Sequence, residues 1–310
     1  MVYPLESPLA PGLLWDKIQQ QTRHALACEA LQPIATEHEF IEQGGMRFLV
    51  RILANLARKQ SASQAQAAQS KVGKAVNPFL PYDDDLFVAN LSPTHLCLLN
   101  KYNVVDHHIL IVTRTFEDQD TWLTLADFEA LTLAMADIDG LAFYNGGRLA
   151  GASQAHKHLQ LMPPPLCPDG GPLPLAQVVE ALGFKVDFGP GDLPSSQPIA
   201  YNPAFPFRHA IASLPAGWLA SSSAAATLLT AYHALLTHLG IDIARSPQDF
   251  PYNLLIMRGW IMAVRRRQED YQSIPVNSLG FAGSLLVKNQ EQLDLLKAIG
   301  PMTILKNVAA

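Results

Sequence analysis

Two histidines and a glutamine alternate within the stretch AHKHLQLM, at positions 156, 158 and 160. Side chains two residues apart share one face of an extended strand, whereas in a helix they point to different sides. The spacing therefore predicts a strand that presents His156, His158 and Gln160 together on one face. Leu159 and Leu161 then lie on the opposite face, which favours a sheet packed on a hydrophobic core.

The segment before this strand supplies hydrogen-bond donors suited to an anion. Within NGGRLAGASQ, Gly146, Gly147 and Gly151 let backbone N–H groups approach a ligand closely, and Ser153 and Gln154 add side-chain donors. A histidine with the ordinary pKa of about 6.5 already has a free lone pair at neutral pH, and this lone pair can attack phosphorus. A phosphate cradle beside a histidine strand predicts nucleotidyl transfer through a covalent histidine intermediate.

Other interpretations of these polar residues stay open. His-x-His on a strand is a common pair of metal ligands, but a metal site needs further ligands, none is evident nearby, and glutamine binds metals poorly. A purely structural polar row is typical of two histidines alone, and the glycine-rich lead-in counts against it. The acidic residues 83–85 could hold a divalent ion, yet their position after Pro81 and Tyr82 is typical of a solvated turn. The three arginines at 265–267 are expected to end a strand in water.

The composition is that of a globular protein with a large core. With 49% apolar and 16% charged residues, the chain can bury a large core. Its length of 310 residues exceeds that of an average domain and predicts two lobes. Its 22 basic and 27 acidic residues give a net charge of −5, which argues against a nucleic-acid-binding surface. The 3 cysteines form no C-x-x-C pair, so they predict neither a disulfide framework nor a cysteine zinc site and indicate a reducing compartment. No signal peptide or membrane-spanning pattern is recognisable, so a cytoplasmic location is expected.

Local patterns predict the elements that position the histidine strand. Thr124 followed by Asp127 resembles a capping box, and apolar residues then repeat with helical spacing until Gly140. The β-branched run HHILIVT predicts a strand buried on both faces at the centre of a sheet. The other predicted elements are a helix at 15–26, a strand at 46–53 after the turn of Gly44 and Gly45, a short helix at 175–182, a helix from Ser222 or Ser223 to Gly240, a hairpin turning at Arg258 and Gly259, and a helix at 290–299 capped by Asn289. Because regular β–α alternation is missing, an α+β antiparallel architecture is favoured.

Three stretches divide the chain. Residues 1–165 form an N-terminal lobe with the His-x-His-x-Gln strand, and the small polar residues 60–76 within it predict a mobile loop. Residues 166–206 are a proline-rich connection, and residues 207–310 form a C-terminal lobe. The segments HHILIVTR and YNLLIMRG are faintly alike, which suggests a degenerate internal duplication.

These residues resemble a known group of enzymes. HKHLQ is similar to the His-x-His-x-Gln active site in the transferase branch of the histidine-triad superfamily, which includes galactose-1-phosphate uridylyltransferase. The wider match is to ATP adenylyltransferases, also called diadenosine tetraphosphate phosphorylases, through FLVRILANLARK, NPF, LLNKYNVVDHHILIVTR, YNGGRLAGASQAHKHLQ and VNSLGFAGSLLVK. The resemblance implies a histidine-triad-like antiparallel sheet flanked by helices, and it leaves open a duplicated half-barrel of the uridylyltransferase kind. The lack of zinc-binding cysteines counts against the uridylyltransferase alternative.

The resemblance also implies a reaction and a set of residues. His158, the second histidine of the motif, takes AMP from the α-phosphate, His156 supports it, and Gln160 hydrogen-bonds a non-bridging oxygen. Inorganic phosphate then attacks the AMP-histidine, so diadenosine tetraphosphate is converted reversibly to ATP and ADP. The residues implied along the nucleotide and phosphate path are Lys59, Asn100, Lys101, Asn145, Gly151, Ala152, Ser153 and Gln154, completed from the C-terminal lobe by Asn277, Ser278, Leu279 and Lys288.

Ligands and alternative reactions follow from the same resemblance. Magnesium is expected only as the counterion of the nucleotide, with no site built from protein side chains. The partners are small nucleotides rather than nucleic acids or membranes. Nucleotidyl transfer to a sugar 1-phosphate and hydrolysis of a dinucleoside polyphosphate are the alternative reactions.

Overall fold

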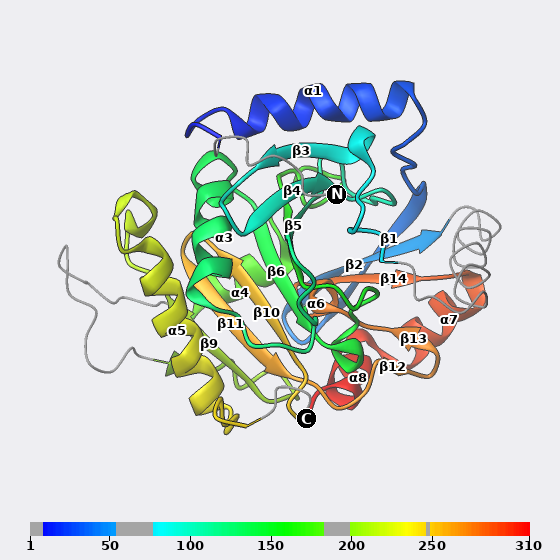
Figure 1. Cartoon of the computed structure of the whole chain (residues 1–310). Helices are drawn as coiled ribbons and strands as arrows, with labels where there is room; N and C mark the ends of the chain where they lie inside the picture. Colours follow the sequence, from blue (N-terminus) through cyan, green and yellow to red (C-terminus); the bar gives the residue numbers. More distant parts are fainter. Residues whose placement is uncertain (1–8, 54–76, 183–198, 246–248) are drawn as a thin grey trace.

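The computed structural model describes residues 9–53, 77–182, 199–245 and 249–310. Its body is a nine-stranded sheet in the order β3-β4-β5-β7-β6-β10-β11-β9-β8, in which all neighbours are antiparallel. The strands are β3 (Phe87–Asn90), β4 (His95–Leu99), β5 (Ile109–Thr113), β6 (Leu141–Gly146), β7 (His158–Met162), β8 (Ile199–Ala200), β9 (His209–Ser213), β10 (Tyr252–Met257) and β11 (Trp260–Arg265). The predicted α+β antiparallel architecture is confirmed (Figure 1).

A second sheet joins the two ends of the chain. β1 (Thr36–Gln43) and β2 (Met46–Leu53) form an antiparallel hairpin that turns at Gly44 and Gly45, as predicted. β14 (Ser284–Val287) then lies parallel to β2, so a C-terminal segment completes a sheet begun by the N-terminal lobe. A two-stranded ribbon of β12 (Asp270–Tyr271) and β13 (Ile274–Pro275) leads to it.

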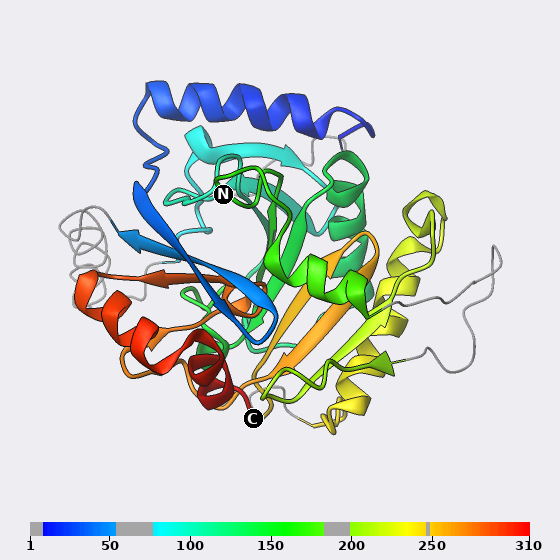
Figure 2. The same cartoon turned by 180° about the vertical axis from the view of Figure 1, so that it is seen from behind.

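Helices and the second sheet cover the two faces of the large sheet. The helices are α1 (Leu14–Ala27), α3 (Leu125–Asp137), α4 (Pro174–Ala181), α5 (Ala224–His238), α6 (Ser278–Phe281), α7 (Gln290–Ile299) and α8 (Pro301–Val308), with short 3-10 turns η1 (Asp84–Leu86), η2 (Arg148–Ala150) and η3 (Trp218–Ala220). α1, α3 and α5 share one hydrophobic core, and the β1–β2 hairpin shares a second with α4, α7 and α8. Figure 2 shows the hairpin and the C-terminal helices on one side of the molecule and α5 on the other.

A unit of strand, helix and hairpin occurs twice in the large sheet. β5, α3, β6 and β7 form the first copy, with β7 between β5 and β6, and β9, α5, β10 and β11 repeat it, with β11 between β9 and β10. β6 and β10 join the copies, and the order β5-β7-β6-β10-β11-β9 is symmetric about this contact. The likeness between HHILIVTR and YNLLIMRG therefore paired the wrong segments. β5, which contains the first of them, corresponds to β9, and β10, which contains the second, corresponds to β6. In the second copy, the strand equivalent to β7 reads WIMAVR and has no histidine.

Signals that act within a few residues of chain predicted the element ends well. The Asp127 carboxylate accepts a hydrogen bond from the backbone N–H of Thr124 at 2.7 Å and so caps α3. Asn289 caps α7, and the hairpin of β10 and β11 turns where predicted. Ser223 is the N-cap residue of α5, but its hydroxyl contacts Ser221 instead of capping the helix.

Longer-range predictions were less accurate or cannot be compared. Leu26, which lies at helical spacing from Ile18 and Thr22 in the helix predicted at 15–26, is exposed, because the buried stripe of α1 consists of Leu14, Ile18, Thr22 and Ala25. α8 was not predicted, although Gly300 and Pro301 are typical of a helix end and a new start. The predicted loop 60–76 lies outside the described residues. None of the helices in the described ranges has the length and apolar content needed to cross a bilayer.

Candidate active site

His158 begins β7 and is held in one tautomer. Its Nδ1 lies 2.9 Å from the backbone carbonyl oxygen of His156, which can only accept a hydrogen bond. Nδ1 therefore carries the proton, and the lone pair of the neutral ring is on Nε2. Burial lowers the pKa of His158 to about 4, with a smaller contribution from the neighbouring His156 ring. The ring is neutral at pH 7 and has an unprotonated nitrogen available for attack.

His156 is a scaffold for this arrangement. It lies before the regular strand, in an isolated bridge to Asp118, so β7 is shorter than predicted. Its Nε2 donates to the backbone carbonyl oxygen of Thr113 at 2.8 Å, and its Nδ1 accepts from the amide Nδ2 of Asn77 at 2.9 Å. With both ring nitrogens engaged, His156 orients His158 through its backbone carbonyl and ties residue 77 to the end of β5.

The face of β7 that carries the histidines is lined by aromatic and apolar groups. The Phe79 ring centroid lies 5.4 Å from that of His158 and 5.6 Å from that of His156, so both imidazoles are on one side of the strand. Across the ladder to β5, His158 pairs with Val112, and Gln160 pairs with Leu110. Val112, Leu110 and Phe79 belong to one hydrophobic cluster, which shields the row from water.

Gln119 fixes the backbone of His158 where the β6–β7 ladder ends. The ladder stops at the pair of Phe143 and Gln160, so the backbone at His158 has no partner in β6. The side chain of Gln119 fills this gap. Its Oε1 accepts from the N–H of His158 at 2.8 Å, and its Nε2 donates to the carbonyl oxygen of Asn145 at 2.9 Å. One amide side chain thus replaces a peptide group between the two strands and sets the position of His158.

The glycine-rich segment approaches the C-terminal lobe closely at Gly151. This residue has φ +89°, and a Cβ built on it would lie 2.7 Å from the carbonyl oxygen of Val276 and 2.8 Å from the Cβ of Asn277. Only glycine fits both the backbone angle and the space. The predicted cradle and the predicted C-terminal contributors are therefore adjacent. Ser153 is exposed and Gln154 half-buried, and among the described residues neither side chain has a hydrogen-bond partner.

A buried polar network holds these two segments together. The Oδ1 of Asn145 accepts from the backbone N–H of Ser278 at 2.9 Å and from the Nδ2 of Asn253 at 2.9 Å. The Nδ2 of Asn253 also donates to the carbonyl oxygen of Ala150 at 2.8 Å, and the Oδ1 of Asn253 accepts from Arg266 at 2.6 Å. Arg266 is 1% exposed, and its burial lowers its pKa to about 9. Asn145 and Ser278 thus join the lobes from within, and their predicted contact with a nucleotide stays a prediction.

Two family models together match most of the chain. The Ap4A phosphorylase N-terminal domain matches residues 5–181, and the ATP adenylyltransferase C-terminal domain matches residues 203–310. The chain belongs to the Ap4A phosphorylase family.

Relatives and solved structures agree with this assignment. Diadenosine tetraphosphate phosphorylase 2 of Saccharomyces cerevisiae is 29% identical over 258 residues, which are 76% of this chain and 76% of the relative. The crystal structure of yeast Ap4A phosphorylase Apa2 in complex with Ap4A matches with a TM-score of 0.76 at 25% identity, covering 97% of this chain and 98% of that chain. The complex of Apa2 with AMP matches with a TM-score of 0.77 at 25% identity, covering 97% of each chain.

On the face of β7 opposite the histidines, this family member buries an ion pair. The Lys157 side chain is fully buried, and its Nζ lies 2.7 Å from the Oδ2 of Asp127 and 3.2 Å from Glu117. Burial acts to raise the pKa of Asp127, but the hydrogen bond from His95 and the attraction of Lys157 outweigh it and lower that pKa to about 2. Because Asp127 also caps α3, the pair links this helix directly to the strand of His158.

The remaining predicted site residues lie at several places. Asn100 is half-buried, with its Nδ2 3.1 Å from the Nδ1 of His108, and Lys101 is 3.8 Å from Asp83 in an exposed ion pair. Asn277 caps α6 through a hydrogen bond to the N–H of Leu279, and Ala152 is half-buried in the glycine-rich segment. Lys288 is exposed at the end of β14. Lys59 lies outside the described residues. Whether these residues bind the nucleotide stays a prediction.

Four residues of the site were not predicted. Gln119 and Asn253 lie in stretches without a local motif, and only their long-range hydrogen bonds reveal them. Arg266 was expected in water, and this was wrong, because the fold encloses its guanidinium group among backbone carbonyls of residues 150, 268, 269 and 308. His108 was predicted only as part of the buried run HHILIVT, although its alternation with Leu110 and Val112 could have placed it on the face of the histidine row.

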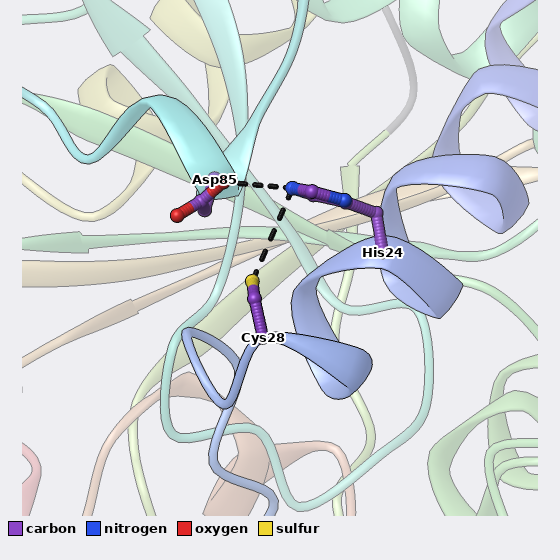
Figure 3. A group of neighbouring side chains, drawn as sticks. All are labelled: His24, Cys28 and Asp85. Carbon is purple, nitrogen blue, oxygen red and sulfur yellow. Dashed lines mark hydrogen bonds and ion pairs between the residues drawn. The ribbon is translucent and has the colours of Figure 1, made fainter.

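Metal-ligating side chains converge elsewhere. In the described part of the chain, the group able to hold a metal ion consists of His24, Cys28 and Asp85, on α1 and η1 rather than on the histidine strand (Figure 3). On the histidine strand, both ring nitrogens of His156 are engaged, whereas His158 keeps its Nε2 free, so the two imidazoles do not offer a pair of free nitrogens to one ion.

Proposed function

We propose that this protein degrades diadenosine tetraphosphate by phosphorolysis. Inorganic phosphate is the second substrate, ATP and ADP are the products, and the reaction is reversible. The proposal rests on membership of the Ap4A phosphorylase family and on the likeness to the yeast enzyme whose structures contain Ap4A and AMP. The observation that carries the mechanism is the tautomer of His158, which leaves a lone pair on Nε2 of a neutral ring.

The reaction has two displacements on one phosphorus atom. The Nε2 of His158 forms a bond to the α-phosphorus of the dinucleotide, the bond to the bridging oxygen breaks, and ATP leaves. An oxygen of inorganic phosphate then attacks the AMP-histidine, the P–N bond breaks, and ADP leaves with the neutral imidazole restored. During the first step the ring becomes positively charged, and the carbonyl of His156 that accepts from Nδ1 stabilises this charge.

The neighbouring groups would bind charge rather than transfer protons. Gln160 offers an amide that donates without titrating at any physiological pH. The backbone N–H groups near Gly151, with Ser153 and Gln154, would receive the phosphate chain. Magnesium would enter with the nucleotide as its counterion. We also propose a cytoplasmic location, which the three free cysteines support.

Isotope transfer tests the reaction. Purified protein is incubated with diadenosine tetraphosphate and labelled inorganic phosphate, and the nucleotides are then separated. Phosphorolysis places the label in ADP. If the dinucleotide disappears while all label stays in phosphate, the enzyme is a hydrolase and the proposal is wrong. Exchange between UDP-glucose and labelled glucose 1-phosphate would instead identify a sugar nucleotidyltransferase.

A pair of variants tests the nucleophile. His158→Ala should abolish turnover and also the acid-labile AMP adduct that forms when phosphate is withheld. His156→Ala removes an imidazole that serves as scaffold, so it should slow the reaction but still form the adduct. Full activity of His158→Ala would refute the mechanism.

A further inference from the structure

His108 is a third histidine beside the catalytic row. It directly precedes β5, in which Leu110 pairs with Gln160 and Val112 pairs with His158. Alternation along the extended chain places His108 on the same face as Leu110. Its ring centroid lies 5.8 Å from that of Phe143, which is itself paired with Gln160 across the β6–β7 ladder. His108 therefore continues the row beyond Gln160.

Within the described residues, no acceptor meets the outer nitrogen of His108 at full hydrogen-bond geometry. The side chain is 7% exposed, and its Nε2 is completely buried. The amide of Asn100 donates from Nδ2 to the Nδ1 of His108 at 3.1 Å, so Nδ1 is the acceptor and Nε2 carries the proton. Burial lowers the pKa of His108 to about 4, and the ring of His158 adds to this, whereas a side-chain hydrogen bond with Gln160 opposes it. This contact with Gln160 is weak, because no acceptor in the described part of the chain meets Nε2 at full hydrogen-bond geometry. The ring is neutral, and its N–H donor lacks a strong acceptor.

A buried donor without an acceptor destabilises a fold unless a ligand uses it. We propose that the Nε2–H of His108 donates to a non-bridging phosphate oxygen of the substrates, which makes His108 a further catalytic residue of the site. This inference rests on the proposed function. Two species offer such an oxygen, the α-phosphate of the nucleotide and the free inorganic phosphate that attacks it.

Two substitutions separate a donor from a structural ring. His108→Phe keeps the ring volume and removes the donor, and His108→Gln places an amide N–H at a similar reach. His108→Phe should lower kcat/KM roughly ten- to a hundredfold, the loss expected for one hydrogen bond to a charged oxygen. Its thermal midpoint should stay equal or rise, because a buried donor without a strong acceptor has been removed. His108→Gln should recover most of the activity.

The kinetic step identifies the oxygen. Slower formation of the AMP adduct without phosphate would assign the contact to the nucleotide, and a raised KM for phosphate would assign it to the free anion. If His108→Phe matches the unaltered protein in both steps, or if both variants lose activity and thermal midpoint together, the inference is wrong. Failure of the unaltered protein to place label in ADP would instead reject the proposed function.

An independent cluster lies on the surface between α1 and η1. His24 lies in the last turn of α1, Cys28 is the C-cap residue that follows the helix four positions later, and Asp85 reaches them from η1. The Nε2 of His24 lies 2.7 Å from the Oδ1 of Asp85 and 3.9 Å from the Sγ of Cys28. Figure 3 shows that both contacts converge on this one nitrogen. A nucleophilic Cys-His-Asp relay would use the two different ring nitrogens, so the arrangement does not fit a relay.

Convergence on one point is instead the geometry of ligands around an ion. The three ligand atoms lie within 4.8 Å of one another. Bonds of about 2.0–2.3 Å in a tetrahedral zinc site imply ligand separations of about 3.3–3.7 Å. This range lies between the 2.7 Å from His24 to Asp85 and the 3.9 Å from His24 to Cys28. The side chains of His24 and Asp85 are 54% and 51% exposed, so water can take the fourth position. We further propose that His24, Cys28 and Asp85 form a surface site for a divalent transition-metal ion such as Zn²⁺.

Thiol protection tests this site. Cys28 is the exposed cysteine of the three, and Cys97 and Cys167 are buried, so iodoacetamide should label Cys28 selectively. After treatment with a chelator, one equivalent of Zn²⁺ should slow this labelling at least tenfold. His24→Gln should label at the unprotected rate with or without Zn²⁺. Labelling that Zn²⁺ does not change, or protection that persists in His24→Gln, would show that the cluster is only an ion pair beside a thiol.

Discussion

Gly151 offers the sharpest test of how the two lobes form one site. Replacing it with alanine has two separable costs. An L-residue at φ +89° is destabilised by about 1–2 kcal/mol from its own backbone. The new methyl group would also lie 2.7 Å from the Val276 oxygen and 2.8 Å from the Asn277 Cβ, so the segment must shift. Overpacking of this kind costs about 1–3 kcal/mol.

A matched glycine isolates the second cost. Gly12 has φ +85°, and a Cβ there meets nothing within 4 Å, so Gly12→Ala carries the backbone cost alone. In equilibrium urea unfolding, Gly12→Ala should lose about 1–2 kcal/mol and Gly151→Ala about 2–5 kcal/mol. The difference, roughly 1–3 kcal/mol, measures the close approach of the lobes.

Activity gives a second readout of the same contact. Displacement of Asn277 also moves Ser278, which donates its backbone N–H to Asn145 beside the catalytic strand. Misplaced substrate-binding groups commonly cost roughly tenfold or more in kcat/KM, and this loss should appear only in Gly151→Ala. Equal losses of unfolding free energy and unchanged activity in both variants would refute the idea that this approach assembles the site.

Three further outcomes follow from the buried charges. Lys157→Met removes the cation paired with the buried Asp127 carboxylate and should lower the free energy of unfolding in urea by about 3–5 kcal/mol. Lys297→Met, the control at an exposed pair with Glu39, should change it by less than about 1 kcal/mol. The folded state holds the pKa of Asp127 at about 2, below its unfolded value, so the stabilisation from this carboxylate is complete above about pH 4 and is lost as the pH falls toward 2. Roughly 2 kcal/mol of the free energy of unfolding should disappear over this window. Urea unfolding of Asp127→Asn at the same pH values should lack this component. Formation of the AMP adduct, measured without inorganic phosphate because that substrate itself titrates near neutral pH, should have a rate that stays flat down to about pH 5, since the pKa of His158 is about 4. An acid limb near 6.5 in this half-reaction would show that His158 titrates like an exposed imidazole.

The buried Lys157 connects the strand of His158 to helix α3. The alternation that places His156 and His158 on the site face forces Lys157 to the other face, against α3. There, Asp127 neutralises the lysine and caps the helix with the same carboxylate. The position of His158 is thus coupled to the first turn of α3 through Asp127, which lies 31 residues earlier in the chain.

Features that depend on neighbouring residues were determined by the sequence alone. The period of two at His156, His158 and Gln160 requires an extended chain to bring these side chains together. The rings of both histidines do lie on one side of this chain, because both contact Phe79. The Thr124–Asp127 capping box and the Asn289 cap satisfy N–H groups within the next three residues, so no distant contact can alter them easily.

Features that depend on distant residues were decided by the tertiary structure. Gln119 became a support of His158 only because the β6–β7 ladder ends there and leaves an N–H without a partner. Arg266 was buried because the carbonyls that satisfy it come from residues 150 and 308, and no pattern around three consecutive arginines records this. The proton on Nε2 of His108 likewise depends on Asn100 taking the other nitrogen. Hydrogen-bond satisfaction is a property of the enclosed volume, which exists only after the chain has folded.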